Sequence, residues 1–96
     1  MAFGGRRMTS LFRFQGNTLE YVTAGAVFRR QSHERLTEIA EITALYADAA
    51  GVPHLRFDLV FRRRHAGETD EGPRVLAARA FFDQFSERVP RGAPAG

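Results

Sequence analysis

Apolar and polar residues alternate in two short segments near the start of the chain, and this pattern predicts a β-hairpin. The segments, residues 10–15 and 18–23, flank Gly16-Asn17, a two-residue turn suited to positive φ. The register that this turn imposes pairs three sets of residues across the strands: Phe14 with Leu19, Phe12 with Tyr21, and Arg13 with Glu20. One face is then apolar and the other carries an opposite-charge pair, so we expect the rest of the domain to cover the aromatic face.

Residues 33–50 show a helical periodicity instead. Ser32 is a suitable N-cap, and Gly51 followed by Val52-Pro53 is typical of a helix end. The apolar positions recur at intervals of three and four residues: Leu36, Ile39, Ala40, Thr43, Tyr46, Ala47 and Ala50. The pattern predicts a helix over 33–50, and the short connection after it predicts a strand parallel to the one before the helix.

Residues 54–64 alternate strictly, which predicts a half-buried strand with apolar residues on one face and charged residues on the other. A polar loop is expected over 65–72, after which Pro73 suits the first turn of a second helix. The apolar stripe of this helix consists of Val75, Ala78, Phe82, Phe85 and Val89.

These elements together predict an α+β fold, a small two-layer sandwich with the order ββαβα. Its three-stranded sheet would consist of the β-hairpin plus a parallel crossover strand, with both helices on one face. The Gly-, Pro- and Arg-rich ends show no periodicity. We therefore expect a flexible N-terminal leader over 1–9, a single α+β domain over 10–89, and a flexible C-terminal tail over 90–96.

The longest uncharged apolar stretches are only a few residues, far short of the ~20 residues that a membrane-spanning helix needs. Arg6-Arg7 resemble the start of an export signal, but Arg13 interrupts the apolar run that should follow. We therefore expect a cytoplasmic protein with no membrane partner.

Composition excludes several kinds of site. The chain of 96 residues has 14 basic residues against 11 acidic ones, a net charge of +3, and every basic residue is Arg. The absence of Lys excludes Schiff-base chemistry and a Walker-type phosphate loop, and the absence of Cys excludes disulfides, thiolate nucleophiles and Cys-based zinc sites. The three His residues are far apart in the sequence. The sequence therefore predicts no catalytic, metal or cofactor site.

Arginine clusters at the end of the predicted third strand, where guanidinium groups could bind phosphate. The candidate anion or nucleic-acid residues are Arg56, Arg62, Arg63, Arg64, Arg29 and Arg30. The alternative is a solvated strand end, balanced by the acidic residues of the following loop. The outer sheet face carries no aromatic platform in the predicted arrangement, which argues against a base-stacking module and leaves a weak contact with the nucleic-acid backbone.

Asp58 in mid-strand has a second interpretation. Over roughly residues 18–82, with Arg56-Phe57-Asp58 as the matching residues, the chain resembles the later half of predicted bacterial endonucleases related to Holliday-junction resolvases. This resemblance implies an inactive nuclease-like domain, because the catalytic Glu-x-Lys of such enzymes requires Lys. Pairing of Asp58 with Arg56, Arg62 or Arg13 is the favoured interpretation.

The predicted second helix carries an excess of aromatic residues. Phe81 and Phe82 project about 100° apart on a helix, so two helices over three strands cannot easily bury both. Leu45 falls in a row of acidic residues on the predicted first helix, namely Glu34, Glu38, Glu41 and Asp48. We therefore assign Phe81, Phe82, Phe85 and Leu45 to a candidate interface. The alternative is a wide apolar face that packs on the sheet.

Three hypotheses follow. The first is a non-enzymatic interaction or assembly module, a homo-oligomer formed through the phenylalanine-rich helix or an edge strand. The second is a weak binder of nucleic acid or another polyanion through the arginine residues. The third is a small oligomeric enzyme, or an inactive nuclease-like domain.

Overall fold

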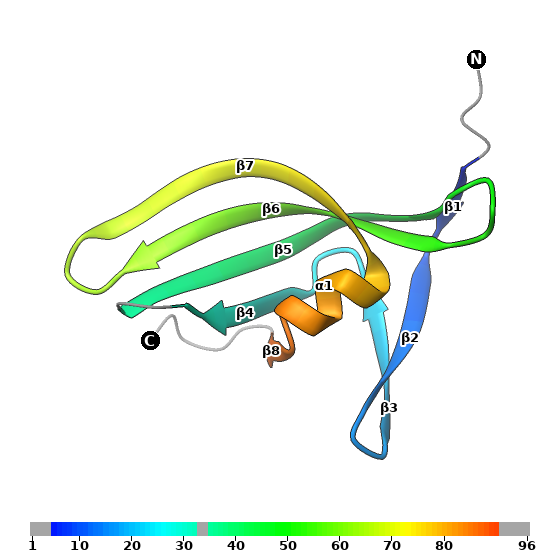
Figure 1. Cartoon of the computed structure of the whole chain (residues 1–96), viewed down its shortest axis with the longest axis horizontal. Coiled ribbons are helices and arrows are strands. Elements are labelled where there is room, and N and C mark those ends of the chain that lie inside the picture. The colour runs from blue at the N-terminus through cyan, green and yellow to red at the C-terminus, as the bar shows by residue number, and fades with distance from the viewer. Residues whose placement is uncertain (1–4, 33–34, 91–96) are drawn as a thin grey trace.

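The computed structural model describes residues 5–32 and 35–90, which form eight strands and one short helix (Figure 1). In chain order these are β1 Arg6–Met8, β2 Ser10–Gln15, β3 Thr18–Thr23, β4 Val27–Gln31, β5 Leu36–Ala47, β6 Pro53–Arg63, β7 Gly67–Ala77, α1 Ala78–Gln84 and β8 Glu87–Val89. No helix in these two ranges is long and apolar enough to cross a membrane.

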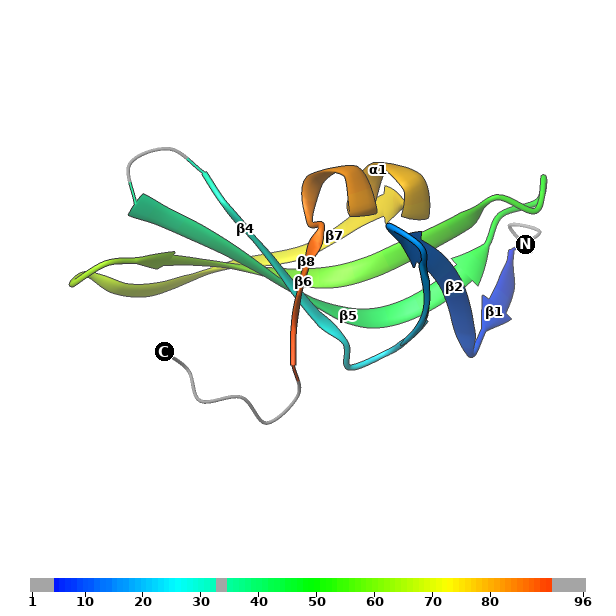
Figure 2. The same cartoon turned by 90° about the horizontal axis from the view of Figure 1, so that it is seen from below.

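Antiparallel pairing organises the strands into two sheets. The larger has the order β7-β6-β5-β4-β8, and β1 pairs with the end of β5 that β4 does not reach. The smaller sheet is the β2–β3 hairpin, which projects away from the long strands (Figure 1). Figure 2 shows α1 on one face of the larger sheet, with the hairpin beside it. The expected leader includes Arg6–Met8, which form β1, while residues 1–4 and 91–96 lie outside the described chain.

Phenylalanine rings from three elements form the centre of the core between α1 and the sheet. Phe81 is fully buried, and its ring contacts Phe57 at 4.9 Å, Phe85 at 5.0 Å and Phe28 at 5.5 Å, measured between ring centroids. Edge-to-face and stacked pairs of this kind stabilise a core beyond the area that they bury. One short helix therefore covers the sheet because Phe81 in α1 and Phe85 directly after it supply two of these rings.

The predicted α+β sandwich is wrong. The structure is mostly strand, with an antiparallel six-stranded sheet in place of three strands, no parallel crossover in the described ranges, and one helix in place of two. The long helix predicted over 33–50 is replaced, in the described residues 35–50, by β5 and the turn after it, and residues 33 and 34 lie outside the described chain. Two features of the β5 sequence obscure the alternation of apolar and polar residues that is typical of a strand. Glu38 faces inward because it pairs with Arg30, and a bulge at Thr43 shifts the phase so that Leu45 is buried.

The second predicted helix is also wrong over most of its length. Residues 65–72 were expected to form a loop, but β7 begins at Gly67 and continues through Pro73 to Ala77. Pro73 led to the wrong prediction because proline is common in the first turn of a helix. Proline is also tolerated in an edge strand such as β7, where its missing N–H need not interrupt the hydrogen bonds between strands. The half-buried strand predicted over 54–64 is confirmed by the alternating burial of β6.

Truncation of Phe81 to Ala tests the aromatic core. The substitution removes a fully buried ring together with its contacts, so we expect the free energy of unfolding to fall by about 3–5 kcal/mol in denaturant titrations. Phe14→Ala is the matched control, because Phe14 is 72% exposed and should change stability by less than about 0.5 kcal/mol. Equal effects of the two substitutions would contradict the core described above.

Candidate functional site

The β2–β3 hairpin exposes the largest group of apolar side chains on the described surface. Its predicted register is confirmed at all three pairs, but its orientation is the reverse of the one expected. Phe12, Phe14, Leu19 and Tyr21, which we call the apolar hairpin face, are 59%, 72%, 53% and 53% exposed. Phe12 and Tyr21 also contact each other across the strands, with ring centroids 5.0 Å apart. The aromatic face therefore points to solvent.

Arg13 occupies the inward face that the aromatic residues were expected to fill, and it is only 9% exposed. Its guanidinium lies 4.9 Å from the ring centroid of Phe28 and 4.8 Å from that of Phe82, within the range of cation–π attraction. Nε donates to Glu20 Oε1 at 2.7 Å, and Nη2 donates to the carbonyl oxygen of Ser86 at 3.1 Å. Arg13 therefore attaches the hairpin to both β4 and the segment after α1.

Apolar residues share the inward face with Arg13. Leu11 is 7% exposed and Val22 is fully buried, and they face each other two pairs along the hairpin from Arg13 and Glu20. Both faces of the hairpin therefore carry apolar side chains. A pattern of alternation fixes the two faces but does not decide which of them is covered.

The exposed face of the hairpin is uncharged over its whole length. The three cross-strand pairs that form it are Ser10 with Thr23, Phe12 with Tyr21, and Phe14 with Leu19. An exposed aromatic platform of this kind is what base-stacking modules use, but these modules surround it with basic side chains that hold phosphate. Because none of the six residues is basic, the face favours an apolar partner over a nucleic acid.

The candidate interface residues predicted from the sequence belong to the protein core or pack against it. Leu45, Phe81 and Phe85 are buried, and Phe82 is half-buried against the same core. Sequence reasoning treated Phe81 and Phe82 as too many rings for two helices and three strands. The longer sheet and the inserted guanidinium of Arg13 supply the missing contacts, so packing accounts for these phenylalanines.

Three of the six candidate anion-binding arginines are engaged with carboxylates. Arg29 pairs with Glu87 at 2.8 Å, Arg30 with Glu38 at 3.0 Å, and Arg62 with Glu68 at 2.6 Å. The hydrogen bond and charge of Arg29 lower the pKa of Glu87 below its usual value, and the same contact raises the pKa of Arg29. Arg29 thus connects β4 to β8, and Arg30 connects β4 to β5.

The remaining arginines separate into two places. Arg56 is exposed in the middle of β6, away from the strand end. Arg63 and Arg64 line a hollow of about 520 Å³ at the end of the sheet near the β6–β7 turn. We call this the basic hollow; its lining includes Arg35, Arg62, Arg63 and Arg64, together with His65. Of the predicted anion residues, the structure therefore brings together Arg62, Arg63 and Arg64.

Asp58 does not pair with an arginine among the described residues. It is exposed, and across the sheet it faces Glu41 on β5 and Pro73 on β7. No group of three potential metal ligands occurs in residues 5–32 and 35–90. No family model matches the chain, and neither curated proteins nor solved structures show a significant similarity to it. The resemblance to endonucleases around Asp58 therefore gains no support.

The Arg13–Glu20 pair is tested by removing one partner or both. Arg13→Met leaves Glu20 without its cation and removes both cation–π contacts, so we expect a loss of about 2–4 kcal/mol in unfolding free energy. The double variant Arg13→Met/Glu20→Gln should recover at least about 1 kcal/mol of this loss, because no unpaired carboxylate remains. Additive losses in denaturant titrations would show that the two side chains do not interact.

Proposed function

We propose that the protein is an assembly module that forms a homodimer through the apolar hairpin face. The observation that carries this proposal is the exposure of Phe12, Phe14, Leu19 and Tyr21 on one uncharged surface. From their exposed fractions, these side chains present roughly 450 Å² of apolar area. This is as large as the largest apolar patch of a typical monomer, and such patches are often functional.

A second copy of the chain suits this face better than a charged partner. The chain carries a net charge of +3, so a contact between two copies is least unfavourable where the surfaces that meet add no like charges at close range. The apolar hairpin face carries no charge. In a dimer with a two-fold axis, the same face of each copy would pack against that of the other copy. Aromatic side chains also lose little conformational entropy on binding, which favours them as anchors.

The size of the face predicts the strength of the dimer. Two copies would together bury roughly 900 Å² through these side chains, slightly below the ~1,200 Å² at which stable interfaces begin. Within the described chain, β2 and β3 pair only with each other, so an outer edge of the hairpin can add backbone hydrogen bonds at the same contact. We therefore expect a reversible dimer with a dissociation constant of about 1–100 μM.

Sedimentation equilibrium of wild type and Phe14→Ser tests this dimer. Wild type should dimerise with a midpoint in the stated range, whereas Phe14→Ser should weaken association at least about tenfold because it removes the most exposed ring. Val52→Ser is the matched control, since Val52 is an exposed apolar residue in the β5–β6 turn and should leave association unchanged.

Two results would overturn this proposal. One is a wild-type protein that stays monomeric up to about 1 mM, where even a weak specific contact is populated. The other is a dimer that Phe14→Ser and Val52→Ser leave equally intact, since the contact would then lie elsewhere. Raising the salt concentration should leave the dissociation constant nearly unchanged, because the face carries no charge.

The basic hollow supports a second candidate function, binding of a polyanion such as a nucleic-acid backbone. Among the described residues, Arg35, Arg63 and Arg64 form no ion pair, and all three line the same hollow. Guanidinium groups grouped in this way can bind successive phosphates, and such binding falls steeply with salt concentration. The proposal does not require recognition of a nucleotide sequence, since contacts of this kind depend only on the charge of the phosphates.

Titration with mixed-sequence single-stranded DNA tests the basic hollow. Each arginine that meets a phosphate contributes about 0.7 to the slope of log K against log salt, so Arg63→Gln/Arg64→Gln should reduce this slope by about 1.4. Arg7→Gln/Arg79→Gln changes the net charge equally but lies outside the hollow, and it should retain the wild-type slope. Equal effects of the two double variants, or no binding at about 20 mM salt, would refute the assignment.

A further inference from the structure

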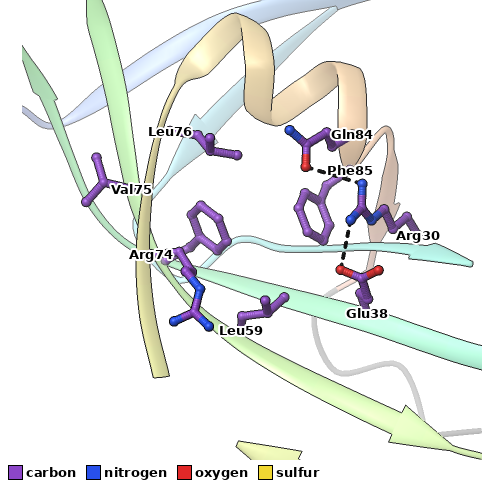
Figure 3. Close-up of a pocket in the computed structure, with 9 residues that line it drawn as sticks. Arg30, Glu38, Leu59, Arg74, Val75, Leu76, Gln84 and Phe85 are labelled. Carbon is purple, nitrogen blue, oxygen red and sulfur yellow. Dashed lines mark hydrogen bonds and ion pairs between the residues drawn. The ribbon is translucent and has the colours of Figure 1, made fainter. Parts of the chain in front are cut away.

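A cavity of about 210 Å³ lies under α1, against the inward face of β6 and β7 (Figure 3). Its apolar lining includes Phe57, Leu59 and Phe85, which are all buried in the core. The polar residues that complete the lining come from four elements: Arg30 on β4, Glu38 on β5, Arg74 on β7 and Gln84 on α1. Apolar walls with a few converging polar groups are typical of small-molecule sites.

The charges of the lining leave one cation in excess. Arg30 and Glu38 neutralise each other through a contact of 3.0 Å, and the side chain of Glu38 is only 9% exposed. Arg74 has no carboxylate partner in the described chain, and its one hydrogen bond runs from Nη1 to the carbonyl oxygen of Pro73. The guanidinium of Arg74 therefore retains donors that a bound anion can use.

Gln84 presents a second donor to the cavity. Its Oε1 accepts a hydrogen bond from Nη1 of Arg30 at 3.2 Å. Because a guanidinium only donates, this bond fixes which end of the amide faces Arg30 and turns the amide NH2 away from it. Figure 3 shows that the amide nitrogen points to the side of Leu76, over the cavity. This amide therefore marks the end of the cavity opposite the Arg74 guanidinium (Figure 3).

Gly72 lies beside the Arg74 guanidinium on β7. It lies opposite Leu59 in the β6–β7 pair, where an ordinary residue would direct a side chain over the same face. Its φ of +82° belongs to a bulge that disfavours other residues, and a Cβ added here would lie 3.9 Å from Nη1 of Arg74. The space beside the Arg74 guanidinium is therefore free of side chain from this position.

We propose that this cavity binds a small amphipathic monocarboxylate. The carboxylate accepts hydrogen bonds from Arg74, while the apolar body packs on Phe57, Leu59 and Phe85 and extends toward Gln84. The single uncompensated cation selects a monoanion, and the Arg30–Glu38 pair leaves no free carboxylate to hold an amine. The volume equals that of about seven liquid water molecules, which suits a ligand of about eight to ten non-hydrogen atoms.

Phenylacetate is the probe for this site, and its binding is followed by two-dimensional ¹H–¹⁵N NMR. We expect saturable shifts of the Gln84 side-chain amide and the Leu76 backbone amide, with a dissociation constant of about 0.1–1 mM. Phenylacetamide should bind at least about tenfold more weakly and phenethylamine should not bind, because a charge-assisted hydrogen bond contributes about 1.5–3 kcal/mol.

Arg74→Gln removes the cation that the proposal requires, and it should weaken phenylacetate binding by about 10- to 100-fold. Arg79→Gln is the matched control, because Arg79 is an exposed arginine on α1 that does not line the cavity. Spectra of both variants without ligand confirm that the fold is retained. The proposal is overturned if phenylacetate causes no saturable shifts at about 10 mM, if phenethylamine binds equally well, or if both variants weaken binding to the same extent.

Discussion

The burial of Arg13 is the constraint on which the arrangement of the hairpin depends. Its guanidinium lies against the rings of both Phe28 and Phe82, and Glu20 neutralises its charge from the neighbouring strand. A buried cation needs both a partner and good hydrogen bonds to offset its desolvation, and Arg13 has them. Because these groups lie on one side only, the hairpin has one orientation on the body of the protein. The opposite face, with its aromatic residues, is left to solvent.

A second arginine follows the same principle on the other side of the aromatic core. Arg30 pairs with Glu38 across β4 and β5, and its guanidinium lies 5.0 Å from the ring centroid of Phe85. The core therefore has an arginine–glutamate pair at each of two borders, with aromatic rings between them. Arg88 adds a third guanidinium, 5.6 Å from the ring of Phe28. Arginine tolerates these positions because its planar group stacks on rings and stays charged.

These partly buried ion pairs also explain how much of the structure could be predicted. The hairpin register followed from Gly16-Asn17, and the strand over 54–64 followed from strict alternation, because in both cases local chemistry decides the result. The covered face of the hairpin and the whole of β5 could not be predicted in this way. Arg13 and Glu38 are charged residues in inward positions, and the contacts that hold them there form only in the folded sheet: Arg13 donates to Ser86, 73 residues away, and Glu38 pairs with Arg30 on the neighbouring strand.

The candidate sites were predictable to different degrees for the same reason. The cluster of Arg62, Arg63 and Arg64 is contiguous in sequence, and it remains together in the basic hollow. The cavity draws its lining from β4, β5, β6, β7 and α1, so no spacing in the sequence reveals it. The apolar hairpin face was visible as a pattern, but assigned to the interior. Its identification required knowledge of what lies under the hairpin.

The energetics of the hairpin favour a role in association over one in stability alone. Leaving roughly 450 Å² of apolar surface in water forgoes about 10 kcal/mol of possible burial, which is comparable to the whole stability of a small domain. The inward face holds Leu11 and Val22 beside a charged pair, a smaller apolar area than the face turned outward. A chain that folds only to bury its own surface would gain from the reverse orientation. A second copy placed on the exposed face recovers this surface without loss of the Arg13 contacts, so the buried arginine and the exposed aromatic residues are two results of one arrangement.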